Sequence, residues 1–198
     1  MNTTIIQYNA GNIQSVLFAL ERLGVSANVS GDAETISKSD HVIFPGVGEA
    51  SSAMQYLQER NLDKVIKDLR QPVLGICLGM QLLCSHSEEN DTPCLGILPL
   101  RVQRFHASTH DRIKVPQVGW NSIKDLGSPL FKNVGEGSKV YNVHSYYVPD
   151  EGFSIARTSY GIEYASAVNK GNFYGVQFHA EKSGKVGETI LENFLKLI

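Results

Sequence analysis

Short apolar runs alternate with helix-patterned segments along the first half of the chain, and this alternation limits the possible folds most. Four runs are rich in apolar and β-branched residues and are expected to form strands: 3–8, 25–29, 41–44 and 73–76. Apolar residues recur at helical spacing over 13–23, over 54–69 (one or two helices) and over 78–84. Strands that alternate with helices in this way predict βαβ units around a mostly parallel sheet.

The second half of the chain changes character and becomes mainly strand-like. The expected strands are 97–105, 113–118, 139–143, 153–158, 163–168 and 173–178, and a closing helix is expected over 186–197. Consecutive strands of this kind need antiparallel neighbours. We therefore predict an α/β fold with a mostly parallel central sheet flanked by helices and an antiparallel β extension. No linker-like stretch divides residues 1–198, which predicts one domain.

Composition excludes several classes of function. A net charge of -2 gives no basic surface for nucleic acid or an anionic membrane. No apolar run approaches the roughly 18 to 20 residues that span a bilayer, and the N-terminus does not resemble a signal peptide. The 3 cysteines are too few for a disulfide framework and lack the C-x-x-C spacing of zinc sites. We expect a cytoplasmic protein without metal or cofactor.

The sharpest local feature is the segment 75–79, which reads Gly-Ile-Cys-Leu-Gly between an expected strand and an expected helix. A tight turn there would push the Cys77 side chain clear of the sheet, as in a nucleophile elbow. The helix N-terminus would favour a thiolate, and the Leu78 N–H would stabilise an oxyanion. The alternative is a buried core cysteine, which is also our expectation for Cys84 and Cys94.

A thiol nucleophile needs a base and a group that orients the base. Residues 175–181 read Gly-Val-Gln-Phe-His-Ala-Glu, so a strand ending at His179 would place Glu181 on the same face if extended geometry persists. A lone histidine at a strand end is more often structural. The pairing of His179 with Glu181, in a chain that also has an elbow at Cys77, instead favours His179 as a base. The histidines at 41, 86, 106 and 110 have no such setting.

Segments 75–81 (GICLGMQ) and 175–181 (GVQFHAE) resemble the two signatures of class I, or triad, glutamine amidotransferases. Nearly the whole chain is similar to the glutaminase subunits of imidazole glycerol phosphate synthases. Six segments carry that second resemblance: 8–12 (YNAGN), 45–48 (PGVG), 77–83 (CLGMQLL), 114–121 (KVPQVGWN), 143–146 (VHSY) and 179–184 (HAEKSG).

The resemblance implies a role for each motif. Cys77 would attack the side-chain amide of glutamine, His179 would act as acid and base, and Glu181 would orient His179. Val47 and Leu78 would donate N–H groups to the oxyanion. The residues expected around the glutamine are Gly48, Gln81, His144, Ser145 and Tyr146. Without the resemblance, 45–48 is a simple turn and 143–146 an ordinary strand end.

The resemblance also implies a protein partner, a (β/α)₈-barrel cyclase that receives the ammonia and acts in histidine biosynthesis. Asn12, Trp120 and Lys182 would face that partner in a heterodimer. Trp120 is the only tryptophan, in an expected loop, and exposed tryptophans often anchor interfaces. A buried core position is the alternative for Trp120, and a solvated charge is the alternative for Lys182.

Two residues depart from the family pattern. Asn9 stands where glycine is usual, and asparagine tolerates a left-handed turn. Ala180 replaces a common proline, which leaves the spacing between His179 and Glu181 less fixed. Three other interpretations stay open: a related amidotransferase pair in cell-surface sugar biosynthesis, a free-standing cysteine γ-glutamyl hydrolase, and a degenerate non-enzymatic domain. The last predicts a lost triad residue, and all three are present.

Overall fold

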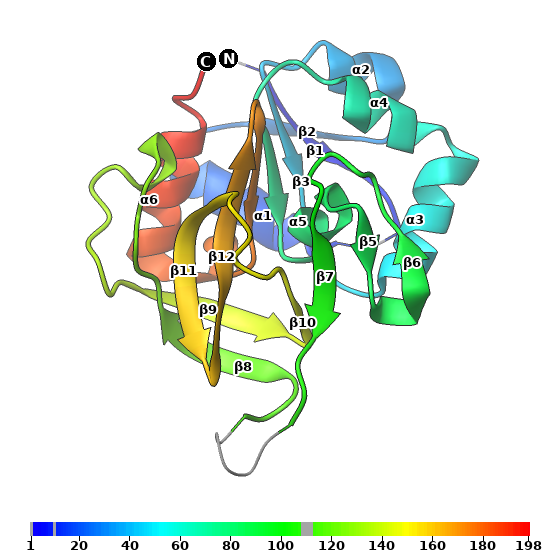
Figure 1. The fold of residues 1–198 in the computed structure, drawn as a ribbon. Coiled ribbons are helices and arrows are strands. Elements are labelled where there is room, and N and C mark those ends of the chain that lie inside the picture. The colour runs from blue at the N-terminus through cyan, green and yellow to red at the C-terminus, as the bar shows by residue number, and fades with distance from the viewer. Residues whose placement is uncertain (1, 10, 108–112) are drawn as a thin grey trace.

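A computed structural model describes residues 2–9, 11–107 and 113–198, and a seven-stranded sheet forms the centre of the described chain (Figure 1). Its strands are β1 (Thr3–Ile6), β2 (Ala27–Ser30), β3 (His41–Phe44), β4 (Val73–Ile76), β11 (Ser154–Tyr160), β12 (Ile162–Lys170) and β13 (Phe173–Val176). In the order β11-β12-β13-β4-β3-β1-β2, the five strands from β13 to β2 are parallel, and β12 and β11 add antiparallel pairs. This confirms the predicted fold class.

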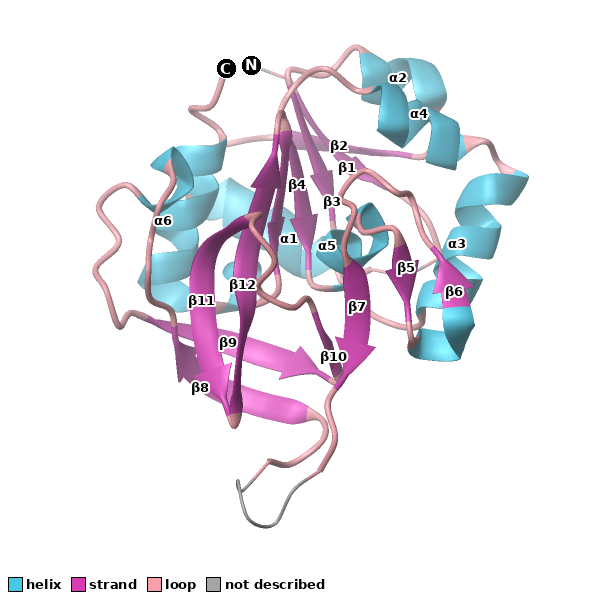
Figure 2. Cartoon of the chain, in the orientation of Figure 1, coloured by secondary structure: helices cyan, strands magenta, loops and turns pink. Residues whose placement is uncertain are grey.

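Helices cover both faces of the sheet. The α-helices are α1 (Ile13–Arg22), α2 (Ala33–Ser37), α3 (Ala50–Glu59), α4 (Leu62–Asp68), α5 (Leu78–Leu83) and α6 (Gly184–Phe194). Successive strand residues point to opposite faces, so Ile5 joins the core under α1 and α6, whereas Ile6 joins the core with α2 to α5. The figure coloured by secondary structure shows α1 and α6 on one side of the sheet and α3 and α4 on the other (Figure 2).

Two smaller sheets stand at the carboxyl end of the parallel strands. One has the order β10-β7-β5-β6 and contains β5 (His86–Ser87), β6 (Thr92–Pro93), β7 (Arg101–Arg104) and β10 (Tyr146–Tyr147). The other pairs β8 (Gln117–Ser122) with β9 (Lys139–His144) in an antiparallel ribbon. Three 3₁₀ turns, η1 (Glu89–Asp91), η2 (Pro129–Phe131) and η3 (Ala180–Lys182), complete the described elements.

The structure corrects several expected boundaries. The strand expected over 113–118 instead starts at Gln117, directly after Pro116, which has no N–H to donate to a ladder. The strand expected over 97–105 covers only Arg101–Arg104, and β13 ends at Val176. Helix α2 and the two-residue strands β5, β6 and β10 were not expected, because such short elements carry no periodic signal. The expectation for position 110 lies outside the described residues.

No helix within residues 2–9, 11–107 and 113–198 is long and apolar enough to cross a membrane. The asparagine at position 9 does not adopt the left-handed conformation that would substitute for glycine, and its side chain instead donates to the Ser52 carbonyl at 3.1 Å. A left-handed residue does end the first helix, where Gly24 has a φ of 74°.

Candidate active site

Cys77 lies in a strained turn between β4 and α5. Its φ of 54° and ψ of -109° fall in a region that non-glycine residues rarely adopt, and such strain gathers at functional sites. The flanking glycines make the turn possible, because a Cβ on Gly79 would collide with the Phe44 carbonyl oxygen, and a Cβ on Gly75 would lie 2.7 Å from the Met80 nitrogen. The sequence therefore folds this segment into the expected elbow.

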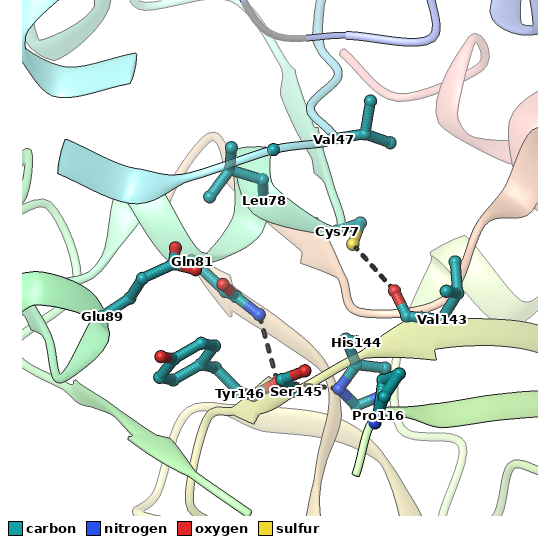
Figure 3. Close-up of a pocket in the computed structure, with 11 residues that line it drawn as sticks. Val47, Cys77, Leu78, Gln81, Glu89, Pro116, Val143, His144, Ser145 and Tyr146 are labelled. Carbon is teal, nitrogen blue, oxygen red and sulfur yellow. Dashed lines mark hydrogen bonds between the residues drawn. The ribbon is translucent and has the colours of Figure 1, made fainter. Parts of the chain in front are cut away.

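The elbow opens into a cavity of about 340 Å³, and Figure 3 shows the Cys77 sulfur directed toward it. The cavity is lined by Val47, Gly48, Cys77, Leu78, Gln81, Glu89, Pro116, Val143, His144, Ser145 and Tyr146. Every residue expected around glutamine from the resemblance is in this set. A cavity of this size with few polar groups suits a small molecule.

His179 and Glu181 form a buried pair behind the elbow. His179 Nδ1 lies 2.7 Å from Glu181 Oε1, and both side chains are almost fully buried. The expected extended path is wrong, since the chain enters η3 after His179, and it is this 3₁₀ turn that brings the carboxylate beside the ring. Burial disfavours the charged ring, yet the nearby Cys77 and the hydrogen-bonded Glu181 carboxylate raise the pKa of His179 to about 10.

Several hydrogen bonds hold the segment around this pair in place. The His179 N–H donates to the Tyr141 carbonyl at 2.9 Å, and the Ser183 hydroxyl donates to the His179 carbonyl at 2.6 Å. Ser183 also accepts from the Tyr141 N–H at 3.0 Å. The ribbon strand β9 and the turn η3 are thus tied together, which fixes the segment although Ala180 stands where proline is common.

Two predicted residues, Gln81 and His144, converge on the carbonyl oxygen of Tyr146. Gln81 Nε2 donates to this oxygen at 3.1 Å, and His144 Nδ1 donates to it at 2.7 Å. Burial lowers the pKa of His144 to about 4, so its ring is neutral near pH 7 and Nε2 can accept from Tyr164 at 3.3 Å. These contacts hold the wall of the cavity that 144–146 form.

The Leu78 N–H, which the elbow would direct at an oxyanion, donates instead to the Gly46 carbonyl oxygen at 3.3 Å. Gly46 lies in the segment that follows β3, next to Val47, whose side chain is exposed. Gly48 in the same segment has a φ of 120°, a conformation that favours glycine. The Leu78 N–H, one of the two expected oxyanion donors, is therefore bound by the loop that carries Val47, the other expected donor.

The residues expected to face a partner are all accessible to some degree. Trp120 is 57% exposed, and its ring packs edge-on against Tyr141 at 5.9 Å, so a buried core position is excluded. It lies within β8, not in the expected loop, because the strand begins at Gln117. Lys182 is exposed in η3, and Asn12 is half-buried at the start of α1.

Two polar side chains of the site were not predicted. Glu89 lines the cavity from η1, and burial raises the pKa of its carboxyl group. Gln177 is fully buried, and its Nε2 lies 3.7 Å from the Cys77 sulfur. Glu89 belongs to no recognisable sequence motif, and it reaches the cavity because the loop that contains η1 folds back toward it. Gln177 lies within the second signature, 175–181, but the signature alone did not indicate a role for its side chain.

The remaining thiols lie apart from this chemistry. Cys84 is fully buried, and burial raises its pKa well above the usual range. Burial also raises the pKa of Cys94 to about 12. All three cysteines are unpaired. Within the described residues, no cluster of His, Cys, Asp and Glu side chains could hold a metal ion.

Comparison with known proteins establishes the family. The family model of class I glutamine amidotransferases matches residues 4–198. The chain belongs to this family. Among curated relatives, the Bacteroides fragilis imidazole glycerol phosphate synthase subunit HisH is 53% identical over 100% of both chains. The protein of the same name from Idiomarina loihiensis is 44% identical over 100% of this chain and 98% of its own length.

Solved structures of the family share the fold at low sequence identity. A crystal structure titled as a glutamine amidotransferase superposes with a TM-score of 0.74 at 17% identity, covering 99% of this chain and 98% of that one. A glutamine amidotransferase from Thermotoga maritima gives a TM-score of 0.65 at 15% identity, covering 99% of this chain and 83% of that one. These likenesses concern the fold alone.

Proposed function

We propose that this chain is the glutaminase subunit of an imidazole glycerol phosphate synthase, which hydrolyses glutamine to glutamate and ammonia. The observation that carries the proposal is the arrangement of Cys77 on a strained elbow at a cavity, with the buried His179–Glu181 pair behind it. The full-length relatives named HisH support the choice of this synthase over a cell-surface sugar pathway or a free-standing hydrolase.

The first half of the reaction forms a thioester. The Cys77 sulfur attacks the side-chain amide carbon of glutamine, giving a tetrahedral intermediate whose oxygen carries the negative charge. With its raised pKa, His179 is protonated near neutral pH, which stabilises a thiolate beside it. The imidazolium then donates its proton to the leaving nitrogen. The carbon–nitrogen bond breaks, and ammonia and a γ-glutamyl thioester result.

The second half returns the enzyme to its starting state. His179, now neutral, takes a proton from water, and the resulting hydroxide adds to the thioester carbon. The carbon–sulfur bond breaks, which releases glutamate and the Cys77 thiolate. Glu181 keeps the ring oriented through its 2.7 Å contact with Nδ1 and stabilises its charged form. Once the Leu78 N–H is released from the Gly46 carbonyl, the backbone N–H groups of Val47 and Leu78 stabilise the oxyanion in both halves.

The cavity wall supplies contacts for the rest of the glutamine molecule. Glu89 is the acidic side chain among the lining residues, so its carboxylate is suited to the α-ammonium group of glutamine. A bound cation would also compensate the burial that raises the pKa of Glu89. Gly48, Gln81 and the segment 144–146 bound the remainder of the cavity.

The ammonia is used by a second protein, a (β/α)₈-barrel cyclase that makes imidazole glycerol phosphate and aminoimidazole carboxamide ribotide in histidine biosynthesis. Trp120 and Lys182 are exposed, and Asn12 is partly exposed, which makes them available to that partner in a heterodimer. We assign the protein to the cytoplasm, where thiols such as the three unpaired cysteines remain reduced.

The test uses the chain in complex with its cyclase. Replacement of Cys77 by serine is expected to abolish synthesis driven by glutamine and to leave synthesis driven by added ammonia unchanged. Loss of both activities would mean that Cys77 is structural and would contradict the proposal. A complex that uses ammonia but never glutamine, even with the native cysteine, would contradict the glutaminase assignment directly.

A further inference from the structure

Gln177 connects the cavity wall to the nucleophile. It follows β13, is fully buried, and anchors its backbone by donating an N–H to the Ser166 carbonyl at 2.9 Å. Its side chain accepts a hydrogen bond from Gln81 Nε2 at 3.0 Å and lies with its own Nε2 3.7 Å from the Cys77 sulfur. No step described above uses this amide.

The neighbours of Gln177 fix which end of its amide faces the sulfur. The Tyr146 carbonyl can only accept, so Gln81 must turn its NH₂ group toward it, at 3.1 Å. The second hydrogen of that NH₂ group then requires an acceptor, which Gln177 Oε1 provides at 3.0 Å. A flipped Gln177 would set two NH₂ groups against each other, so its own NH₂ group is left facing Cys77.

A thiolate at Cys77 would be stabilised by such an N–H donor. Its other polar contact is the Val143 carbonyl oxygen at 3.9 Å, which can accept from a thiol but repels a thiolate (Figure 3). A buried thiolate is costly, because burial favours the neutral form. A hydrogen-bond donor therefore adds to the stabilisation that the charge of His179 supplies. An N–H directed at the sulfur from the Gln177 amide offsets that cost.

We propose that Gln177 is a catalytic residue that stabilises the Cys77 thiolate through its side-chain N–H, and that Gln81 is the positioning residue that orients it. The proposal rests on the proposed function, in which Cys77 is the nucleophile. It gives the buried glutamine of the second signature a chemical task, and it links the wall of the cavity at Tyr146 to the reactivity of the sulfur through two amides.

The test is the pH profile of Cys77 alkylation by iodoacetamide in the full chain, followed by peptide mass spectrometry. In Gln177→Met, which keeps the length of the side chain but has no N–H, the midpoint of the profile is expected at higher pH. Alkylation at neutral pH is expected to be about tenfold slower, as for a lost hydrogen bond to a charged group. In the complex with the cyclase, kcat for glutamine should fall about tenfold with KM nearly unchanged.

Asn193→Leu is the matched control, because it also removes a buried amide, one that donates to the Leu130 and Lys132 carbonyls far from the thiol. It is expected to lower stability without moving the alkylation profile. If Gln177→Met does not fold, Gln81→Met replaces it, since loss of the orienting amide should move the midpoint in the same direction by a smaller amount.

A folded Gln177→Met chain with the native alkylation profile and kcat would overturn the role of Gln177 and leave the proposed function standing. A native chain whose Cys77 is no more reactive than Cys94, in a complex that does not hydrolyse glutamine, would overturn both. A moved midpoint with lowered kcat supports the inference, because a purely structural role would lower stability alone.

Discussion

The backbone N–H of Leu78 donates to the carbonyl oxygen of Gly46 across 3.3 Å, so a donor that we propose for the oxyanion is occupied within the chain itself. The Gly46 carbonyl belongs to the peptide unit whose N–H is that of Val47. Rotation of this peptide would release the Leu78 N–H and redirect the Val47 N–H in the same movement. On the proposed function, the Leu78 donor is therefore not free to bind the oxyanion in this structure.

This relationship predicts that the isolated chain hydrolyses glutamine slowly. An oxyanion donor contributes roughly 10² to 10³ in rate, so the chain alone should be slower than the complex by at least about that factor. The measurement is glutaminase activity of the chain alone, with the cyclase, and with the cyclase and its nucleotide substrate. A stepwise rise is expected, because docking and nucleotide would favour the turned peptide. Equal rates in all three would contradict the switch.

Cys77 is predicted to be the only essential thiol. A glutamine-like electrophile should label it first, because burial raises the pKa values of Cys84 and Cys94 and keeps them protonated. Cys84→Ser and Cys94→Ser should keep glutaminase activity within a few-fold of the native complex. Peptide mapping after partial labelling shows which thiol is modified first. Modification of Cys84 or Cys94 before Cys77 would contradict the prediction.

Removal of the Glu181 charge is predicted to lower the pKa of His179. The native ring, raised from 6.5 to about 10, stays protonated through neutral pH. Its contribution to stability is therefore complete below about pH 6.5 and is lost as pH rises through about 10. Glu181→Gln should move the ring titration toward 6.5, measured by NMR of labelled imidazole. An unmoved titration would mean that the carboxylate does not stabilise the charged ring.

Replacement of Glu89 by glutamine is predicted to weaken the binding of glutamine. Loss of the charge opposite the α-ammonium should raise KM about tenfold while kcat stays within about threefold. Glu88→Gln is the matched control, since Glu88 is the neighbouring exposed carboxylate and does not line the cavity. Steady-state kinetics of the complex distinguish the two variants, and a fall in kcat alone for Glu89→Gln would assign it a different role.

Trp120→Ala is predicted to weaken the complex with the cyclase by at least about tenfold, as for an exposed aromatic anchor. Among the aromatic rings of the described residues, Trp120 contacts Tyr141, and loss of this edge contact should lower the free energy of unfolding by about 1 kcal/mol. Ile198→Ala is the control, because Ile198 is exposed at the end of the molecule opposite β8 (Figure 1). Titration calorimetry measures the affinity of each variant for the cyclase. If Trp120→Ala binds the cyclase as tightly as the native chain does, Trp120 is not part of the interface.

The parallel sheet, the elbow and the pairing of His179 with Glu181 could all be predicted from the amino-acid sequence. These features depend on signals that are local in the chain, namely apolar periodicity and glycines at points of close approach. A glycine at 75 or 79 is required by atoms within a few residues or on the adjacent strand. Such requirements can be recognised before any contact between distant segments is known.

The completion of the site depends on tertiary packing instead. The η3 turn, and not an extended strand, brings Glu181 to the ring, because Ser183 and Tyr141 hold that turn from outside it. Gln177 reaches the Cys77 sulfur from 100 residues away. Glu89 and the Leu78–Gly46 bond likewise join segments that share no local pattern. Hydrogen bonds between distant residues depend on how the layers pack, and packing is not encoded in the period of any one segment.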